Sequence, residues 1–254
     1  SVLHQFAHRP LGVPGTLLGS VQVPETRPLS KRLKDWHYWW QAHLFDCIID
    51  AQIRHPEENR ARLARKMVRA SVIRNGFKRT NSYYDDMAWW GLALQRGNDV
   101  FGTSVSVAPI IRACRGAIRA EGVVPWRIGD DFLNAPANGP VAIMLARAGY
   151  RDEAARITDW IARNLMLGSG LVADGVVVSQ EGAPVYTYCQ GVVLGAELEV
   201  MGADSPRMIA DLVSAIWRHL TDPDGVIAGQ GGGDGGLFAG ILARYLTLVA
   251  NRFE

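Results

Sequence analysis

The fold class is decided by the stretch DWHYWWQAHLFDCIIDAQIR, residues 35–54, in which apolar side chains recur every three to four residues. Trp36, Trp40, Leu44 and Ile48 stand four residues apart, and this spacing predicts a helix with a wide apolar stripe. A second periodic segment follows Pro56, a residue that suits the first turn of a helix. The folded part of the chain is therefore expected to begin as a pair of amphipathic helices.

The same pattern repeats through the rest of the chain. Ser205-Pro206 is the clearest helix start, because serine caps a helix and proline fits the first position after the cap. About nine helices in successive hairpins predict an all-α fold. Helices rich in aromatic, acidic and amide residues alternate with plain amphipathic ones, which indicates inner helices around a polar site and outer helices as scaffold. The further helices are expected over about 83–97, 103–120, 138–149, 152–166, 188–202, 206–220 and 236–252.

Two regions depart from the helical pattern. Residues 171–172 and 176–178 are apolar and flank Asp174-Gly175, a sequence that indicates a β-hairpin, and residues 184–188 also look extended. Residues 1–30 are rich in proline and glycine and show no sustained apolar period. We therefore expect an extended N-terminal arm over residues 1–30 and a single helical domain over residues 31–254.

Composition excludes several classes of protein. A chain of 254 residues that is 48% hydrophobic can bury one large core. The formal net charge is only +2, and the basic residues over 60–79 recur as on a solvated helix face, whereas a nucleic-acid partner requires a concentrated basic stripe. No apolar run approaches the roughly 20 residues of a membrane span. No signal peptide is visible, so the expected location is either the cytoplasm or, after processing, the exterior.

Metal and cofactor sites are not expected. The three cysteines show no CxxC spacing and leave at most one optional disulfide, and the six histidines show no HxH or HExxH spacing. The sequence GGGDGG, residues 231–236, formally satisfies GxGxxG and precedes a predicted helix. Only about 18 residues follow it, too few for the rest of a dinucleotide-binding fold. We therefore predict no metal and no cofactor.

The densest group of chemically active side chains is SYYDDMAWW, residues 82–90. Adjacent carboxylates among aromatic rings are unfavourable as mere packing, because like charge and burial raise the pKa of one of them. A pair with one ionised and one protonated carboxyl group is what a glycosidase requires. The alternative is that one aspartate caps the helix and the other faces solvent, and spacing alone leaves both interpretations open.

The stretch YYDDMAWW, residues 83–90, resembles the catalytic signature of glycoside hydrolase family 76, the bacterial endo-α-1,6-mannanases. The resemblance runs from about residue 36 to residue 250. It implies an (α/α)6 toroid and retaining hydrolysis of α-1,6-mannosidic bonds in mannan or manno-oligosaccharides, with Asp85 as nucleophile and Asp86 as acid/base. The other matching stretches, in the family's order, are YWWQAH (38–43), NAPANGP (134–140), GLVADG (170–175), YTYCQG (186–191) and the segment from Asp234 to Leu246.

The resemblance also indicates which residues contact the sugar. For Asp174 the alternative role is turn formation before Gly175, and for Trp126 it is core packing. The raised pKa of the pair is expected on Asp86, the proton donor, which together with an ionised Asp85 predicts a mildly acidic optimum. The predicted substrate-binding residues are Tyr84, Trp126, Asp131, Asn138, Asp174, Tyr188, Gln190 and Asp234.

The sequence departs from the family's pattern in three positions and in length. Cys189, Pro136 and Ala239 stand where the family usually has Asn, Ile and Lys. Nine helices fall short of twelve, so either the toroid is incomplete, or the N-terminal arm or a second subunit of a homodimer covers the gap. Three other functions stay open: a transglycosylase that remodels mannan-containing cell-wall glycans, a non-catalytic glycan-binding relative, and a protein-interaction scaffold.

Overall fold

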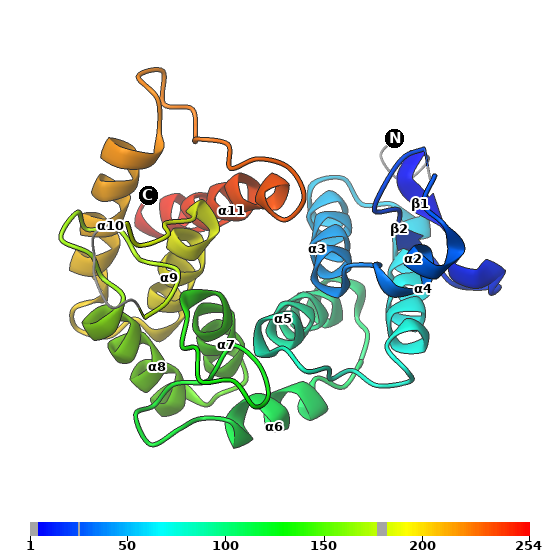
Figure 1. Cartoon of the computed structure of the whole chain (residues 1–254), viewed down its shortest axis with the longest axis horizontal. Helices are drawn as coiled ribbons and strands as arrows, with labels where there is room; N and C mark the ends of the chain where they lie inside the picture. Colours follow the sequence, from blue (N-terminus) through cyan, green and yellow to red (C-terminus); the bar gives the residue numbers. More distant parts are fainter. Residues whose placement is uncertain (1–4, 25, 177–181) are drawn as a thin grey trace. The chain divides into compact units, whose positions relative to one another are not determined.

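The computed structural model describes residues 5–24, 26–176 and 182–254. The chain divides into two compact units, the first formed by Ser1–Asn81 and Trp89–Ile110 and the second by Ser82–Ala88 and Ile111–Glu254. The chain passes from one unit to the other between Asn81 and Ser82, within α5 (Tyr84–Phe101) and within α6 (Ala108–Gly116). Nearly all regular structure in the described residues is helical (Figure 1), so the predicted all-α class is confirmed.

Unit 1 opens with a short antiparallel pair of strands that the sequence analysis did not predict. Strand β1 (Ala7–His8) pairs with β2 (Leu18–Gly19), and the short 3-10 helix η1 (Pro10–Gly12) lies between them. The side chain of Gln41 fastens this ribbon to the first long helix: it accepts from the Gly19 N–H at 2.8 Å and donates to the Gly19 carbonyl at 3.1 Å. Because Leu18 is also buried, residues 7–19 are attached to the helices of unit 1.

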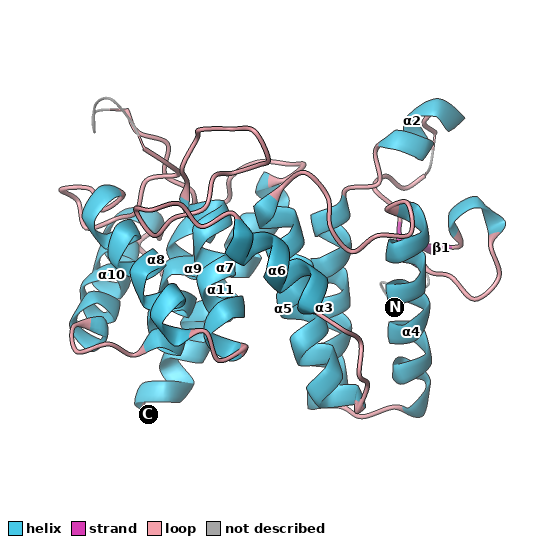
Figure 2. Cartoon of the chain, turned by 90° about the horizontal axis from the view of Figure 1, so that it is seen from below, coloured by secondary structure: helices cyan, strands magenta, loops and turns pink. Residues whose placement is uncertain are grey.

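The helices of unit 1 are α2 (Leu29–Lys34), α3 (Tyr38–Arg54), α4 (Glu58–Arg74) and the part of α5 that follows Ala88. Helix α2 was not predicted from the sequence. Figure 2 shows α3, α4 and α5 side by side. The fully buried Trp90 lies at the centre of their packing. Its indole N–H donates to the Tyr38 carbonyl at 2.9 Å, and its ring centroid is 5.9 Å from that of Phe45.

The buried face of α3 differs from the predicted stripe. The helix begins at Tyr38, because His37 has a left-handed backbone conformation with φ of 46°, and Trp36 therefore lies before the helix. Of the predicted stripe, Trp40 and Leu44 are only partly buried, whereas Ile48 is buried. The buried face of α3 is formed by Tyr38, Gln41, Ala42, His43, Phe45, Asp46, Ile48 and Ile49.

Unit 2 is built around α9 (Thr187–Val200), which packs against α7 (Ala135–Arg147), α8 (Arg151–Asn164), α10 (Ser205–Leu220) and α11 (Gly235–Phe253) (Figure 1). Two glycines set how closely the helices approach. A Cβ atom at Gly139 of α7 would lie 2.5 Å from Val192, and one at Gly195 of α9 would lie 2.3 Å from the ring of Tyr245. Such distances are shorter than carbon atoms tolerate, so only glycine permits this packing of α9 against α7 and α11.

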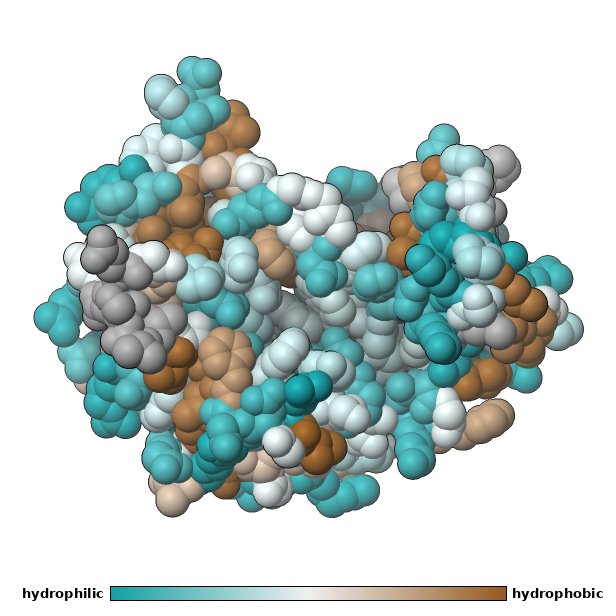
Figure 3. Space-filling view, in the orientation of Figure 1, coloured by the Kyte–Doolittle hydropathy of each residue, from teal (hydrophilic) through white to brown (hydrophobic). Residues whose placement is uncertain are grey.

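Burial within unit 2 follows the predicted alternation of helix types. Helices α7 and α9 are buried on nearly all sides, whereas α10 buries a stripe that includes Ile209, Leu212 and Ile216. Trp217, which was expected on that stripe, is instead 64% exposed. The face drawn in Figure 3 mixes hydrophilic and hydrophobic residues, as expected where amphipathic helices meet solvent.

The largest errors of prediction concern boundaries and strands. Helix α7 begins three residues early because the side chain of Asn134 accepts from the Ala137 N–H at 3.2 Å and so caps the helix. In the described part of the predicted hairpin, Val172 pairs with Met166, and Gly175 pairs with Asn134. Residues 177 and 178 of that prediction lie outside the described residues.

Two further findings concern the described part of the chain. None of its helices combines the length and the hydrophobicity needed to span a bilayer. Within the described residues no disulfide links Cys47, Cys114 or Cys189, and the last two are buried.

Candidate active site

The adjacent carboxylates Asp85 and Asp86 lie in the first turn of α5, in the segment that belongs to unit 2. The residues before them pair with a loop from a distant part of the sequence. The Tyr84 N–H donates to the Trp126 carbonyl at 3.0 Å, and the Ile128 N–H donates to the Ser82 carbonyl at 2.8 Å. These two bonds place Trp126 beside Asp85.

Both carboxylate oxygens of Asp85 accept hydrogen bonds from directed donors. Oδ1 accepts from the Asp86 main-chain N–H at 2.9 Å, and Oδ2 accepts from the indole N–H of Trp126 at 3.0 Å. The indole is itself packed edge-on against Tyr83 and Phe132, with ring centroids 5.1 and 6.4 Å away. The orientation of the Asp85 carboxylate is therefore determined by groups that cannot easily move.

Burial raises the pKa of Asp85 to about 6, and the negative charge of Asp174 acts in the same direction. The hydrogen bonds from Asp86 and Trp126 lower this pKa, but the loss of hydration outweighs them. The sequence argument treated Asp85 as the readily ionised member of the pair and put the raised pKa on Asp86. The structure puts a raised pKa on Asp85, contrary to that expectation. The raised pKa expected for Asp86 stays a prediction.

A third carboxylate, Asp174, interacts electrostatically with Asp85. Its position is set by its main chain, which donates to the Pro184 carbonyl at 2.8 Å and accepts from the Ala135 N–H at 2.7 Å. The thiol of Cys189 approaches Asp174 Oδ1 at 3.7 Å. Burial raises the pKa of Asp174, and burial together with Asp174 keeps the Cys189 thiol protonated by raising its pKa well above the usual value.

Tyr188, in the first turn of α9, completes this group. Burial raises the pKa of its hydroxyl far above the usual value, and the charges of Asp174 and Asp85 contribute. Its ring stacks on Phe238 of α11 with centroids 4.1 Å apart, and the ring of Tyr186 lies 5.3 Å from Phe238. The structure thus brings Asp85, Trp126, Asp174 and Tyr188 into one neighbourhood within unit 2.

Sequence reasoning missed the residues that support this neighbourhood. Tyr186 and Phe238 both lie in the matching stretches, so their aromatic character was the available signal. Gln230, in the loop before α11, accepts from the Thr187 N–H at 2.7 Å and donates to the Val185 carbonyl at 3.0 Å. These bonds tie the glycine-rich loop to the start of α9, and nothing in the sequence pointed to them.

Two predicted substrate-binding amides are fully occupied by the main chain. Asn138 is completely buried and bonds both the N–H and the carbonyl of Val124, at 2.9 and 2.8 Å. Gln190, also completely buried, bonds both groups of Val172, at 2.7 and 2.9 Å. Each also donates to a second carbonyl, that of Asn134 or Tyr186. The two amides therefore hold the loops that carry Trp126 and Asp174.

The other three predicted residues are placed differently. The carboxylate of Asp131 is 98% exposed and pairs with Arg119 at 2.7 Å. Tyr84 is buried near Cys114, and burial raises the pKa of its hydroxyl. Asp234 is exposed just before α11. Asp131 and Asp234 are thus exposed, whereas Tyr84 is buried and is bonded to Trp126 through its main-chain N–H.

Ionisation of Asp85 should cost folding stability. Its folded pKa of about 6 exceeds the value of about 3.9 expected in the unfolded chain, so the folded state binds more protons between these values. Stability is therefore lost as pH rises from about 4 to 6. In Asp85→Asn this loss is absent, and the stability of the variant relative to wild type should grow by about 2 kcal/mol from pH 4 to pH 8, or roughly 4–8 °C in Tm.

Thermal and urea unfolding of both proteins across this pH range provides the measurement. Any hydrogen bond that asparagine fails to make is independent of pH and shifts all points equally. Asp131→Asn is the matched control for removal of one surface carboxylate. A difference between wild type and Asp85→Asn that stays constant from pH 4 to pH 8 would contradict the raised pKa.

Comparison with known proteins supports a carbohydrate-active site. The model of glycosyl hydrolase family 76 matches residues 16–253. The Lin0763 protein from Listeria innocua is 27% identical with a TM-score of 0.80, over 91% of this chain and 72% of that one. The GH76A α-1,6-mannanase from Salegentibacter sp. HEL1_6 is 25% identical with a TM-score of 0.85, over 100% of this chain and 78% of that one.

A further solved structure is an inactive variant of that mannanase, in which two consecutive aspartates are replaced by alanine, in complex with α-1,6-mannotetrose. It is 25% identical to this chain, with a TM-score of 0.84, over 98% of this chain and 77% of that one. A search of curated proteins finds no match to this chain.

Proposed function

Because the chain belongs to glycosyl hydrolase family 76, it is a glycoside hydrolase, and we propose that it cleaves α-1,6-mannosidic bonds with retention of configuration. The observation that carries the proposal is the Asp85 carboxylate. It is partly buried, held at both oxygens by directed donors, and next in sequence to a second carboxylate. The proposed substrate is α-mannan or a manno-oligosaccharide.

The inactive variant of the Salegentibacter mannanase lacks two consecutive aspartates, and this chain contains two such pairs, Asp85-Asp86 and Asp130-Asp131. The second pair is a poor catalytic candidate. Asp131 is exposed, and the N–H of Phe132 and the guanidinium of Arg127 lower the pKa of Asp130. Both the burial and the raised pKa of Asp85 favour the first pair.

In the proposed mechanism, Asp85 attacks the anomeric carbon while Asp86, as the carboxylic acid, gives its proton to the departing glycosidic oxygen. Asp86 then takes a proton from water, which hydrolyses the glycosyl ester of Asp85. The two catalytic carboxyl groups stand about 5–5.5 Å apart in retaining glycosidases and about 6.5–9.5 Å apart in inverting ones, and the shorter separation favours retention here. Side chains on consecutive residues of a helix reach the shorter range more readily.

The other predicted site residues have different proposed roles, according to whether their side chains already bond to the main chain. We propose that Trp126 holds Asp85 in its attacking orientation and that Asp174 and Tyr188 bind sugar hydroxyls. Asn138 and Gln190 would act through the loops that they hold. Asp131 and Asp234 are exposed, and the bond of Tyr84 to Trp126 is made by its main chain. Contact of these three side chains with substrate rests on the family resemblance.

The test is proton NMR during hydrolysis of linear α-1,6-mannan by the wild-type protein. We expect α-mannosyl reducing ends to appear first and β-anomers to grow only by mutarotation. A first product with the β-configuration would contradict retention. Elongated oligosaccharides in excess mannobiose would indicate transglycosylation, and calorimetric binding without turnover would indicate a glycan-binding protein. Linear β-1,4-mannan, which should not be cleaved, is the matched control.

A further inference from the structure

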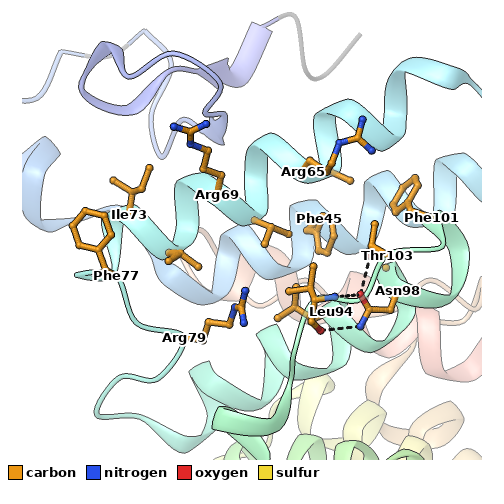
Figure 4. Close-up of a pocket in the computed structure, with 15 residues that line it drawn as sticks. Phe45, Arg65, Arg69, Ile73, Phe77, Arg79, Leu94, Asn98, Phe101 and Thr103 are labelled. Atoms are coloured by element: carbon orange, nitrogen blue, oxygen red, sulfur yellow. Dashed lines mark hydrogen bonds between the residues drawn. The ribbon is translucent and has the colours of Figure 1, made fainter.

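Unit 1 contains a pocket of about 440 Å³ bounded by α4, α5 and the loops that follow them, with Phe45 of α3 at its base (Figure 4). All of its lining residues belong to unit 1. Its volume lies within the range of about 300–1,000 Å³ in which proteins bury small organic ligands. None of the residues proposed to act in hydrolysis lines it.

The walls of the pocket favour an apolar ligand body. Two polar side chains in the lining are already satisfied: Asn98 accepts from the Thr103 hydroxyl at 2.8 Å and donates to the Val105 carbonyl at 2.9 Å. Because these groups already bond within the protein, they favour no polar group on the part of a ligand that lies beside them. The walls are mainly the side chains of Phe45, Val68, Val72, Leu94, Phe101 and Val105.

One cation faces these walls with part of its hydrogen-bonding capacity unused. Arg79 donates from Nη1 to the Ser106 carbonyl at 3.0 Å, whereas its Nε is buried and has no hydrogen-bond partner among the residues that the structure describes. In Figure 4 its side chain points toward Leu94. Nε and Nη2 form the edge of a guanidinium that grips a carboxylate or phosphate through two parallel bonds. A buried donor without an acceptor costs free energy, which an anion at this edge would recover.

The charge of the pocket also favours an anionic ligand. Among its described lining residues are Arg65, Arg69 and Arg79, and there is no aspartate or glutamate. In Figure 4 the guanidinium groups of Arg65 and Arg69 extend away from Phe45, so they add positive potential rather than direct contacts. Charge complementarity therefore requires a negative head group on an apolar body.

We propose that this pocket binds a single-chain amphipathic anion, with its hydrocarbon chain against Phe45, Val68 and Leu94 and its anionic head on the Nε and Nη2 edge of Arg79. A carboxylate and a phosphate share this chemistry. The site is independent of hydrolysis at Asp85, so its occupant need not be a sugar.

The experiment is titration calorimetry of the full chain with decanoate, decyl phosphate and decan-1-ol. We expect both anions to bind and to raise the Tm, and the alcohol to bind roughly 10- to 100-fold more weakly. The tighter of the two anions identifies the head group. Failure of both anions to bind, or equal affinity for anion and alcohol, would overturn the proposal.

Three variants locate the binding. Arg79→Gln should weaken decanoate roughly 10- to 100-fold and leave decan-1-ol unchanged, and retained alcohol binding shows that the pocket is still folded. Arg62→Gln, an exposed arginine of α4 outside the lining, is the matched control and should bind decanoate like wild type. Val68→Phe fills the pocket and should abolish binding of all three probes. Undiminished binding in Val68→Phe would place the ligand elsewhere.

Discussion

We expect Asp85→Asn to lose turnover on linear α-1,6-mannan by about four orders of magnitude or more. An amide oxygen is a poor nucleophile, so the glycosyl–enzyme ester that splits the reaction into two steps cannot form. Asparagine keeps the size and shape of the side chain, and its oxygen can still accept one of the two bonds made by Asp86 and Trp126. The loss should therefore appear in kcat, with affinity for mannotetraose changed only a few-fold.

The matched control is Asp131→Asn, which removes one carboxylate from the other pair of consecutive aspartates. Its side chain lies in solvent and pairs with Arg119 at the surface, so kcat should stay within about twofold of wild type. Initial rates of reducing-sugar release by the three proteins decide the matter. If Asp85→Asn kept more than about a tenth of the wild-type rate, or if Asp131→Asn lost most of it, the nucleophile would have been assigned to the wrong pair.

The helices were predictable because each carries its own periodicity in consecutive residues. Helix α10 illustrates this: Ser205-Pro206 marked its start, and Ile209, Leu212 and Ile216 are buried as expected. Where local signals compete, tertiary packing decides. In α3 the left-handed backbone at His37 delays the start of the helix to Tyr38, and no pattern in residues 35–54 predicts such a conformation.

Part of the candidate site could be predicted because its carboxylates and aromatic rings lie together in one segment, residues 82–90. Asp85 and Asp86 stood out because paired carboxylates among aromatic rings are costly unless they are used. The uses of Asn138 and Gln190 could not be foreseen, because their partners lie 14 and 18 residues away in sequence and depend on how the loops fold. The pKa of Asp85 likewise depends on burial, a property of the folded protein alone.

The proposed roles also predict how Asp86→Asn should behave. With α-1,6-mannan the variant has no acid to protonate the leaving oxygen, so kcat/KM should fall by about 10²–10⁴-fold. With 4-nitrophenyl α-mannoside the leaving group departs without a proton, and formation of the glycosyl–enzyme should return close to the wild-type rate. The Asp85→Asn variant should show no such recovery, because its defect lies in the nucleophile.

The pH profile of kcat/KM separates the two carboxylates further. In wild type the acid limb should fall near pH 6, since burial raises the pKa of Asp85 to about 6 and only the ionised form attacks. The basic limb should report loss of the proton from Asp86, although the coupled pair titrates as a unit. This profile places the optimum nearer neutrality than the mildly acidic value expected from sequence. In Asp86→Asn with the aryl mannoside, the basic limb should disappear while the acid limb remains. A basic limb that persisted unchanged in this variant would mean that another group donates the proton, and the role assigned to Asp86 would have to be given up.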